Sequence, residues 1–151
     1  AVKIEGGLKK IKIIKHLIKN KIPIMGHLGI LPQSTKGKFK SKGKSIKERN
    51  ELIRDCKILE EAGVFSIVLE CVEKKLAKQI TELIKIPTIG IGSSNNCDGQ
   101  ILVIDDILGL TESKMKFVKK FVDVKQLTAY GAKKFREEVK SKKYPSQKYS
   151  Y

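Results

Sequence analysis

Five short apolar runs, each ending on or beside a glycine, a histidine or a carboxylate, constrain the fold of this chain more than any other feature. Nearly continuous apolar sequence of this kind is typical of parallel strands that are buried on both faces. In a (β/α) barrel the carboxyl ends of such strands carry the chemistry. The sequence therefore predicts an α/β fold with functional groups at strand ends. The runs are Val2–Gly7, Ile22–Gly29, Phe65–Cys71, Ile86–Gly92 and Ile101–Asp106.

Helical patterns separate the runs. Apolar residues recur at helical spacing among the lysines of Leu8–Asn20. Ser45 with Glu48 three residues later forms a capping box that predicts a helix start, and Gly63 predicts the end of that helix. Strict alternation of strand and helix indicates a parallel sheet. The expected helices cover Leu8–Asn20, Ile46–Ala62, Lys74–Ile84, Met115–Phe121 and Gln126–Lys140.

The length of the chain predicts an incomplete barrel. A complete eight-stranded α/β barrel takes about 250 residues, whereas this chain has 151. Five strand signals leave roughly three strand–helix units unaccounted for. We find no internal repeat and no domain linker, so we expect residues 1–151 to form a single domain. We expect that domain to be the C-terminal portion of a (β/α)8 TIM barrel that lacks its N-terminal strands.

The charge of the chain raises nucleic acid as a partner. The formal net charge is +16, but only Arg49, Arg54 and Arg136 of the 32 basic residues are arginine, and there is no tryptophan. A chain poor in arginine and aromatic residues is poorly equipped to read or stack on bases. Lysines scattered over solvated faces account for the charge, so we expect no specific nucleic-acid partner.

Cysteine usage and hydropathy point to a cytoplasmic protein. Cys56, Cys71 and Cys97 are odd in number, widely spaced and without a CxxC pair. This pattern is typical of reduced thiols rather than of a disulfide framework or a zinc site. No apolar run approaches the roughly 18 residues of a membrane span. We therefore expect a cytoplasmic location and no membrane partner.

Lys3 and Glu5 are the first candidate site residues. They are two positions apart, so the pleat of a strand places both side chains on one face. Glu5 ends its strand, and Gly6 and Gly7 directly after it allow the backbone to approach a ligand closely. The alternative is an ion pair within the sheet.

His27 and Glu70 are the other candidates. His27 lies between Gly26 and Gly29 at the end of the second run, and its alternative role is a hydrogen-bonded structural residue. Glu70 follows the apolar residues 67–69. Partial desolvation at such a strand end raises the pKa of a carboxyl group and suits it to accept a proton. The alternative for Glu70 is pairing with a neighbouring lysine.

Taken together, the motifs resemble one enzyme family. VKIEGG, PIMGHLGILPQS, LEEAGVFSIVLECV, IPTIGIG and CDGQILV occur in the order and approximate spacing of the 3-methyl-2-oxobutanoate (ketopantoate) hydroxymethyltransferases. The resemblance implies a TIM barrel enzyme of pantothenate and coenzyme A biosynthesis. Such an enzyme transfers a hydroxymethyl group from 5,10-methylenetetrahydrofolate to 3-methyl-2-oxobutanoate, giving 2-dehydropantoate and tetrahydrofolate. Mg²⁺ chelates the keto acid in this family.

The resemblance also implies roles for the candidate residues. It makes Lys3 a contact to the keto acid, Glu5 the carboxylate on the metal side and Glu70 the proton acceptor, while His27 shapes the substrate pocket. The partners implied are the two small-molecule substrates and, in the full-length enzyme, further copies of the same chain. The role of the lysine-rich segment Lys36–Lys44 stays open.

Departures from the family pattern limit these expectations. The family's earlier strands carry an Asp-Ser-Leu-Gly block and a further Asp that provide the principal Mg²⁺ ligands, and this sequence has no equivalent. We therefore expect the chain alone to be inactive or nearly so. One alternative is another Mg²⁺-dependent, enolate-forming barrel enzyme of the phosphoenolpyruvate mutase and isocitrate lyase type. A basic nucleic-acid-binding module is the less favoured alternative.

Overall fold

Five parallel strands lie side by side in the order of the chain. They are β1 (Val2–Glu5), β2 (Ile24–Gly29), β3 (Ser66–Glu70), β4 (Thr88–Ile91) and β5 (Gly99–Gln100). The structure is a computed structural model that describes residues 1–33 and 40–151. The sheet order contains no reversal, which a doubly wound sheet requires, and it is the order of a (β/α) barrel. The predicted parallel α/β sheet is confirmed.

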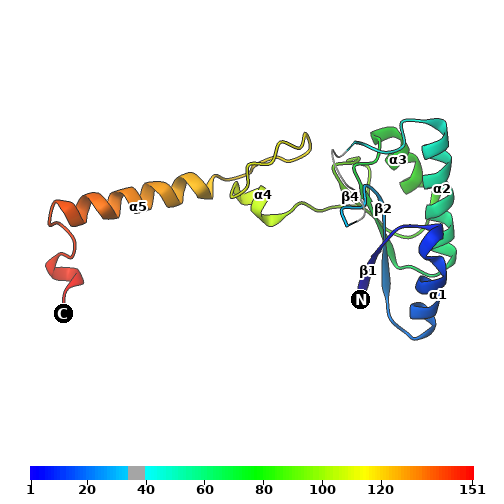
Figure 1. Cartoon of the computed structure of the whole chain (residues 1–151), viewed down its shortest axis with the longest axis horizontal. Coiled ribbons are helices and arrows are strands. Elements are labelled where there is room, and N and C mark those ends of the chain that lie inside the picture. The colour runs from blue at the N-terminus through cyan, green and yellow to red at the C-terminus, as the bar shows by residue number, and fades with distance from the viewer. Residues whose placement is uncertain (34–39) are drawn as a thin grey trace. The chain divides into compact units, whose positions relative to one another are not determined.

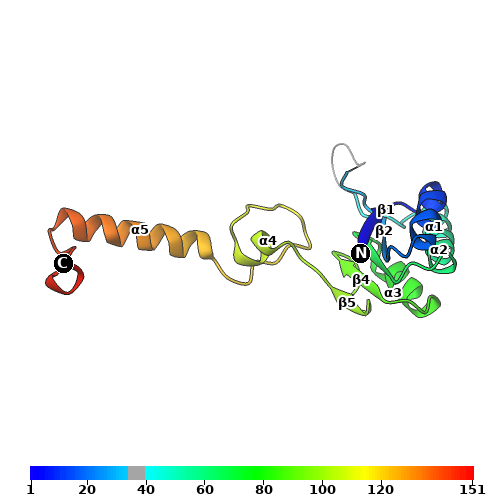
Figure 2. The same ribbon diagram turned by 90° about the horizontal axis from the view of Figure 1, so that it is seen from below.

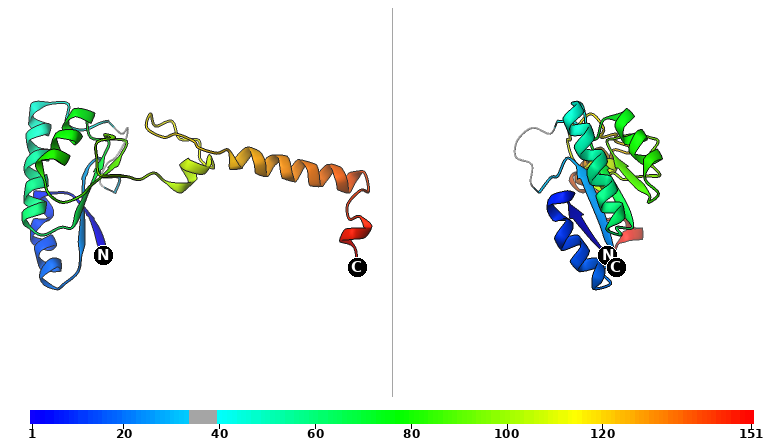
Figure 3. Two further views of the ribbon diagram at one scale, coloured as in Figure 1. Left: turned by 180° about the vertical axis from the view of Figure 1, so that it is seen from behind. Right: turned by 90° about the vertical axis from the view of Figure 1, so that its right-hand side faces the viewer.

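Three helices connect the first four strands on one side of the sheet. They are α1 (Ile11–Lys19), which follows the 3-10 turn η1 (Leu8–Lys10), α2 (Ile46–Glu61) and α3 (Lys74–Leu83). Figures 1 and 3 show all three helices on the same face of the strands. Within the described part of this unit, the opposite face therefore carries no helix. A barrel has this arrangement, with helices outside and the other face turned to the interior.

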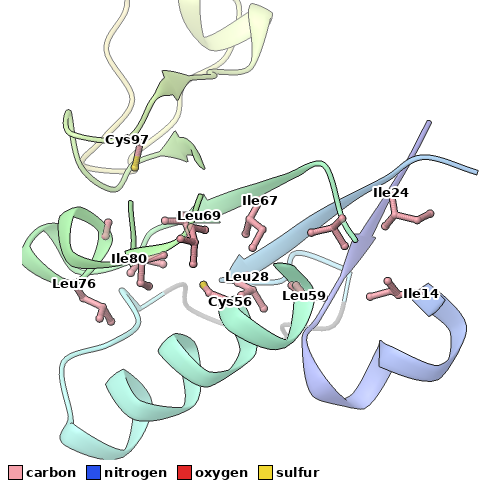
Figure 4. Packing of buried hydrophobic residues seen from close by; sticks show 14 residues of the cluster. Ile14, Ile24, Leu28, Cys56, Leu59, Ile67, Leu69, Leu76, Ile80 and Cys97 are labelled. Atoms are coloured by element: carbon pink, nitrogen blue, oxygen red, sulfur yellow. The ribbon is translucent and has the colours of Figure 1, made fainter. Parts of the chain in front are cut away.

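The core lies between the sheet and these helices (Figure 4). Alternate residues of each strand supply it, so Ile67 and Leu69 of β3 are fully buried there, while Val68 and Glu70 point to the opposite face. The strand side chains meet apolar residues of the three helices. The labelled members of the cluster are Ile14, Ile24, Leu28, Cys56, Leu59, Ile67, Leu69, Leu76, Ile80 and Cys97.

Helix α2 begins where the sequence predicts. The Ser45 hydroxyl accepts a hydrogen bond from the Glu48 N–H at 3.2 Å, which satisfies a donor that the first helical turn leaves free. Glu48 does not complete the reciprocal bond of a capping box. Its carboxylate accepts from the Gly43 N–H at 3.1 Å instead, and so holds the chain that enters the helix. Gly63, with φ 92°, follows the end of the helix.

Two predicted elements are wrong. The run Ile101–Asp106 is not a strand, because β5 precedes it and helix α4 (Ile104–Leu108) begins inside it. Asp105 and Asp106 lie in the first helical turn, where carboxylates are favourable, and Gly109 ends the helix with φ 68°. Met115–Phe121 is not a helix either. The N–H groups of Phe121 and Val122 donate to the distant Ile107 carbonyl, which takes them away from local helical bonds.

The chain forms two compact units, Ala1–Ile101 and Leu102–Tyr151. The second unit contains α4, α5 (Val124–Lys140) and the 3-10 turn η2 (Gln147–Tyr149), with an irregular segment between α4 and α5 (Figure 2). Helix α5 agrees with the expected Gln126–Lys140, and Asp123 caps its start, because its carboxylate accepts a hydrogen bond from the Gln126 N–H. Among the described helices, none has the length and apolar character needed to cross a membrane. That 1–151 is one domain stays a prediction.

Gly29 lies where the backbone of β2 closely approaches the backbone of β3. It has φ 97°, and a Cβ placed on it would overlap the carbonyl oxygen of Glu70. We expect Gly29→Ala to lower the free energy of unfolding by at least about 2 kcal/mol, because the left-handed backbone and the overlap both oppose it. Denaturant unfolding monitored by circular dichroism measures this change.

A matched substitution in α5 controls for the loss of a glycine. Gly131 lies in the middle of the helix, and nothing surrounds its Cβ position within 4 Å. Gly131→Ala should leave stability unchanged or raise it by up to about 1 kcal/mol. Equal effects of the two substitutions would contradict the role given to Gly29.

Asp98 ties the start of β4 to the turn before β5 and provides a prediction about pH. Its carboxylate accepts hydrogen bonds from the Thr88 N–H at 2.8 Å and the Thr88 hydroxyl at 3.0 Å. These bonds lower the pKa of Asp98 below its usual value. The stability they contribute is therefore present above pH 4 and is lost as the pH falls through the lowered pKa, since the folded state then has to take up a proton.

We expect Asp98→Asn to reduce the decline of the melting temperature between about pH 4 and pH 2. Thermal unfolding at a series of pH values measures it. Glu51→Gln, at an exposed glutamate in the interior of α2, is the control and should leave the decline as it is. An unchanged profile for Asp98→Asn would show that the Thr88 bonds do not favour the ionised carboxylate.

Candidate active site

The strand register brings the candidate residues to one face. Glu5 of β1 lies beside His27 of β2, and Gly29 of β2 lies beside Glu70 of β3. Register partners on neighbouring parallel strands point to the same face, as do residues two apart on one strand. Lys3, Glu5, His27 and Glu70 therefore share the face opposite the helices. The sequence predicts this for Lys3 and Glu5, and the structure adds the other two.

His27 lies between two carboxylates. Its Nε2 is 3.0 Å from Oε2 of Glu70, and its Nδ1 is 3.9 Å from Oε1 of Glu5. The imidazole is 1% exposed, and the side chains of Glu5 and Glu70 are 13% and 15% exposed. The three groups thus form one cluster that is closed to water at its centre and open at the carboxylates.

The imidazole is poorly satisfied in this position. Neither ring nitrogen makes a hydrogen bond to any described residue, because the nearby Glu70 oxygen has the right distance but not the right direction. Buried polar atoms without a hydrogen bond are rare in proteins and cost stability. The ring Nε2 lies at hydrogen-bond distance from Oε2 of Glu70, 3.0 Å, so the alternative role of His27, a hydrogen-bonded structural residue, stays open.

Burial sets the protonation states of the cluster. Desolvation, with a further contribution from the charge of Lys3, lowers the pKa of His27 to about 4, so the ring is neutral at pH 7. Burial also raises the pKa of Glu70; Lys3 lowers it in part, and Glu5 adds to the rise. A neutral imidazole has a single N–H and cannot donate to both carboxylates. The raised pKa makes the Glu70 carboxylate a stronger proton acceptor than an ordinary glutamate.

Two backbone features that the sequence does not reveal support the carboxylates. The Gln33 N–H donates to Oε2 of Glu5 at 3.3 Å, so the segment after β2 folds back over β1. Cys71, directly after Glu70, has φ 52°, a left-handed conformation that is unusual for a residue with a side chain. No side-chain type at position 33 or 71 signals either feature, since both depend on backbone atoms.

The described residues do not complete a metal site. They contain no group of three or more histidine, cysteine, aspartate or glutamate side chains placed to hold a metal ion. Mg²⁺ prefers six oxygen ligands, several of them water, with one or two carboxylates. Glu5 fits as a single carboxylate on the open side of the cluster, and further protein ligands would have to come from elsewhere.

Other candidates lie apart from this cluster. The three cysteines are buried and free in the structure. Burial raises the pKa of Cys56 to about 12 and keeps its thiol protonated. The lysine-rich segment Lys36–Lys44 lies partly outside the described residues. Within its described part, Lys42 Nζ is 3.7 Å from Oε1 of Glu48, away from the carboxylates of the cluster.

Fold and site together define a class of protein. Parallel strands in sequential order, helices on one face, and acid–base groups at the carboxyl ends of the strands on the other face are the arrangement of a (β/α) barrel enzyme. The model of the ketopantoate hydroxymethyltransferase family matches residues 1–147. The chain belongs to that family. Its five-stranded sheet is consistent with part of a TIM barrel, and the resemblance seen in the sequence is confirmed.

Several relatives carry the name 3-methyl-2-oxobutanoate hydroxymethyltransferase. The one from Pelagibacter ubique is 58% identical over 151 residues, which is 100% of this chain and 58% of the relative. The relative from Clostridium botulinum (strain 657 / Type Ba4) is 49% identical, over 100% of this chain and 56% of its own length. The relative from Pyrobaculum neutrophilum is 45% identical, over 99% of this chain and 58% of its own length. The chain thus spans less than three fifths of these relatives.

The electrostatics of the cluster predict how His27 titrates. We expect its ring to titrate near pH 4 and Lys3→Met to raise this pKa, because the substitution removes a positive charge that opposes protonation. NMR titration of histidine ring signals measures both values, and the exposed His16 of α1 provides a reference signal in the same sample. A His27 ring that titrates at its usual 6.5 would contradict the burial of the cluster.

Proposed function

We propose that this chain is part of an enzyme that transfers the one-carbon unit of 5,10-methylenetetrahydrofolate to 3-methyl-2-oxobutanoate as a hydroxymethyl group, with water supplying the hydroxyl oxygen, giving 2-dehydropantoate for pantothenate and coenzyme A biosynthesis. The observation that carries the proposal is the position of Glu70, 3.0 Å from the buried His27 and on the same sheet face as Glu5 and Lys3. Family membership supports the substrates. It also weighs against the lyase-type barrel and the nucleic-acid-binding module.

Glu70 acts as the base in this proposal. The carbon next to the ketone of 3-methyl-2-oxobutanoate has to lose a proton before it can form a new carbon–carbon bond. A carboxylate with a raised pKa is suited to take that proton at neutral pH. The neutral ring of His27 lies directly beside the Glu70 carboxylate, with Nε2 3.0 Å from Oε2.

Lys3 and, through a bound metal ion, Glu5 help to stabilise the negative charge that develops on the substrate. The charge of Lys3, which lies on the same sheet face, lowers the pKa values of both His27 and Glu70, and this supports a role for its ammonium group beside the bound substrate. Lys3 binds the keto acid and stabilises its charge. Glu5 lies on the metal side, and bound Mg²⁺ supplies further positive charge to the enolate. The remaining ligands would come from outside the described residues.

The same reasoning bears on the chain alone. With a single suitably placed carboxylate the chain binds Mg²⁺ poorly, so we propose that it is inactive or nearly so without the rest of the barrel. In the complete enzyme, the second product of the proposed reaction is tetrahydrofolate. A cytoplasmic location, assembly into a homo-oligomer and the absence of a specific nucleic-acid partner stay predictions.

A protein that completes the barrel tests the proposal. We define the barrel-completed protein as this chain joined to the part of the Pelagibacter ubique relative that the chain does not match. The assay follows exchange of the C3 proton of 3-methyl-2-oxobutanoate for deuterium. We expect Glu70→Gln to slow this exchange at least about 100-fold, because the variant loses the general base.

The exposed Glu61 at the end of α2 provides the matched control, and Glu61→Gln should leave the rate unchanged. In the unsubstituted protein the rate should rise with pH through a value above the usual pKa of glutamate, since Glu70 has to be ionised to act. A barrel-completed protein that binds the keto acid but exchanges no proton would refute the proposed function.

A further inference from the structure

The hydroxyl group of Ser93 joins two backbone groups on either side of Glu70 and Cys71. Ser93 lies in the turn after β4, and its Oγ donates to the Leu69 carbonyl at 2.7 Å and accepts from the Val72 N–H at 2.9 Å. We propose that Ser93 is a positioning residue that holds the end of β3 so that the Glu70 carboxylate meets His27. This inference rests on the proposed role of Glu70 as the base.

The hydroxyl group of Ser93 bonds to the chain where the backbone ladder of β3 stops. The ladder between β3 and β4 extends to the Cys71 N–H, which donates to the Ile91 carbonyl at 2.8 Å. The chain then turns through the left-handed conformation of Cys71, with φ 52°. After this turn the Val72 N–H no longer faces the backbone of β4. The Ser93 side chain takes the place of the missing ladder partner.

Among the described residues, two backbone bonds hold the opposite side of the strand end. The Ile30 N–H donates to the Glu70 carbonyl and the Lys42 N–H to the Cys71 carbonyl, both at 2.9 Å. These bonds belong to the segments that leave β2 and that return toward α2. The strand end is thus held between two neighbouring segments, and the contact from Ser93 is the one that a side-chain substitution removes.

Loss of this contact acts on Glu70 through its backbone. A left-handed residue with a side chain is strained by about 1 kcal/mol or more, so Cys71 relaxes toward an ordinary conformation once Val72 is released. Rotation there moves the neighbouring Glu70 and its carboxylate. Because Ser93 touches neither the base nor the proposed substrate position, its removal should change catalysis and not substrate binding. A misplacement of about 1 Å lowers rates by up to about 100-fold.

The neighbouring Ser94 provides a matched control. Its hydroxyl donates to Oδ1 of Asn96 at 3.3 Å and accepts from the Asn96 N–H at 3.1 Å, so both bonds stay within the turn. Ser93 and Ser94 therefore carry the same group one residue apart, and only Ser93 bonds to β3 and the residues just after it.

The test uses the barrel-completed protein and its Ser93→Ala variant. We expect kcat for deuterium exchange to fall about five- to twentyfold, with KM unchanged within about twofold. The fall is limited because Ser93 is only half-buried and water can replace part of its bonding. Ser93→Thr keeps the hydroxyl and should restore most of the rate, while Ser94→Ala should match the unsubstituted protein.

A second measurement does not depend on turnover. Amide hydrogen exchange at Val72 should become at least tenfold faster in Ser93→Ala and stay unchanged in Ser94→Ala. If the unsubstituted protein did not exchange the substrate proton, the proposed function would be refuted. The amide exchange rate of Val72 would still decide whether Ser93 holds the strand end. Unchanged kcat in an active protein, or an unchanged Val72 amide, would overturn the inference.

Discussion

The parallel register between β1, β2 and β3 is the constraint on which the candidate site depends. It pairs Glu5 with His27 and Gly29 with Glu70, and so sets an imidazole between two carboxylates from neighbouring strands. Side chains alternate along a strand, so a slip of one residue would turn each group to the opposite face. In β3, such a slip would move Glu70 into the apolar core and Leu69 out of it. Packing of the core therefore fixes the strand register, and the register positions the candidate catalytic side chains.

Two features of the site lower the stability of the folded chain. A buried imidazole without hydrogen bonds and a left-handed Cys71 are both unfavourable in isolation. They persist because the surrounding strands and the helices behind them are well packed, with Ile67, Leu69 and Leu59 fully buried. Unfavourable groups gathered at the ends of two neighbouring strands are typical of a functional site rather than of a purely structural sheet.

Sequence reasoning located the groups but not all of what holds them. The strongly apolar runs at β2 and β3 predict strands close to those observed, and the strand ends then predict where His27 and Glu70 lie. Local patterns failed at Ile101–Asp106 and Met115–Phe121, where helix dipoles and the distant Ile107 carbonyl decide the backbone. The contact from Ser93 was missed for the same reason, because it joins residues more than 20 positions apart.

The partial solvent exposure of Glu5 and Glu70 bears on the proposed reaction. Glu5 and Glu70 keep some exposure, while His27 between them has almost none. Strands added at β1 or β5, the outermost strands of the described sheet, would remove water from this face. Less water strengthens the attraction between Lys3 and a bound keto acid and raises the pKa of Glu70 further. Completing the barrel would therefore make the existing carboxylate a stronger base for the proposed reaction.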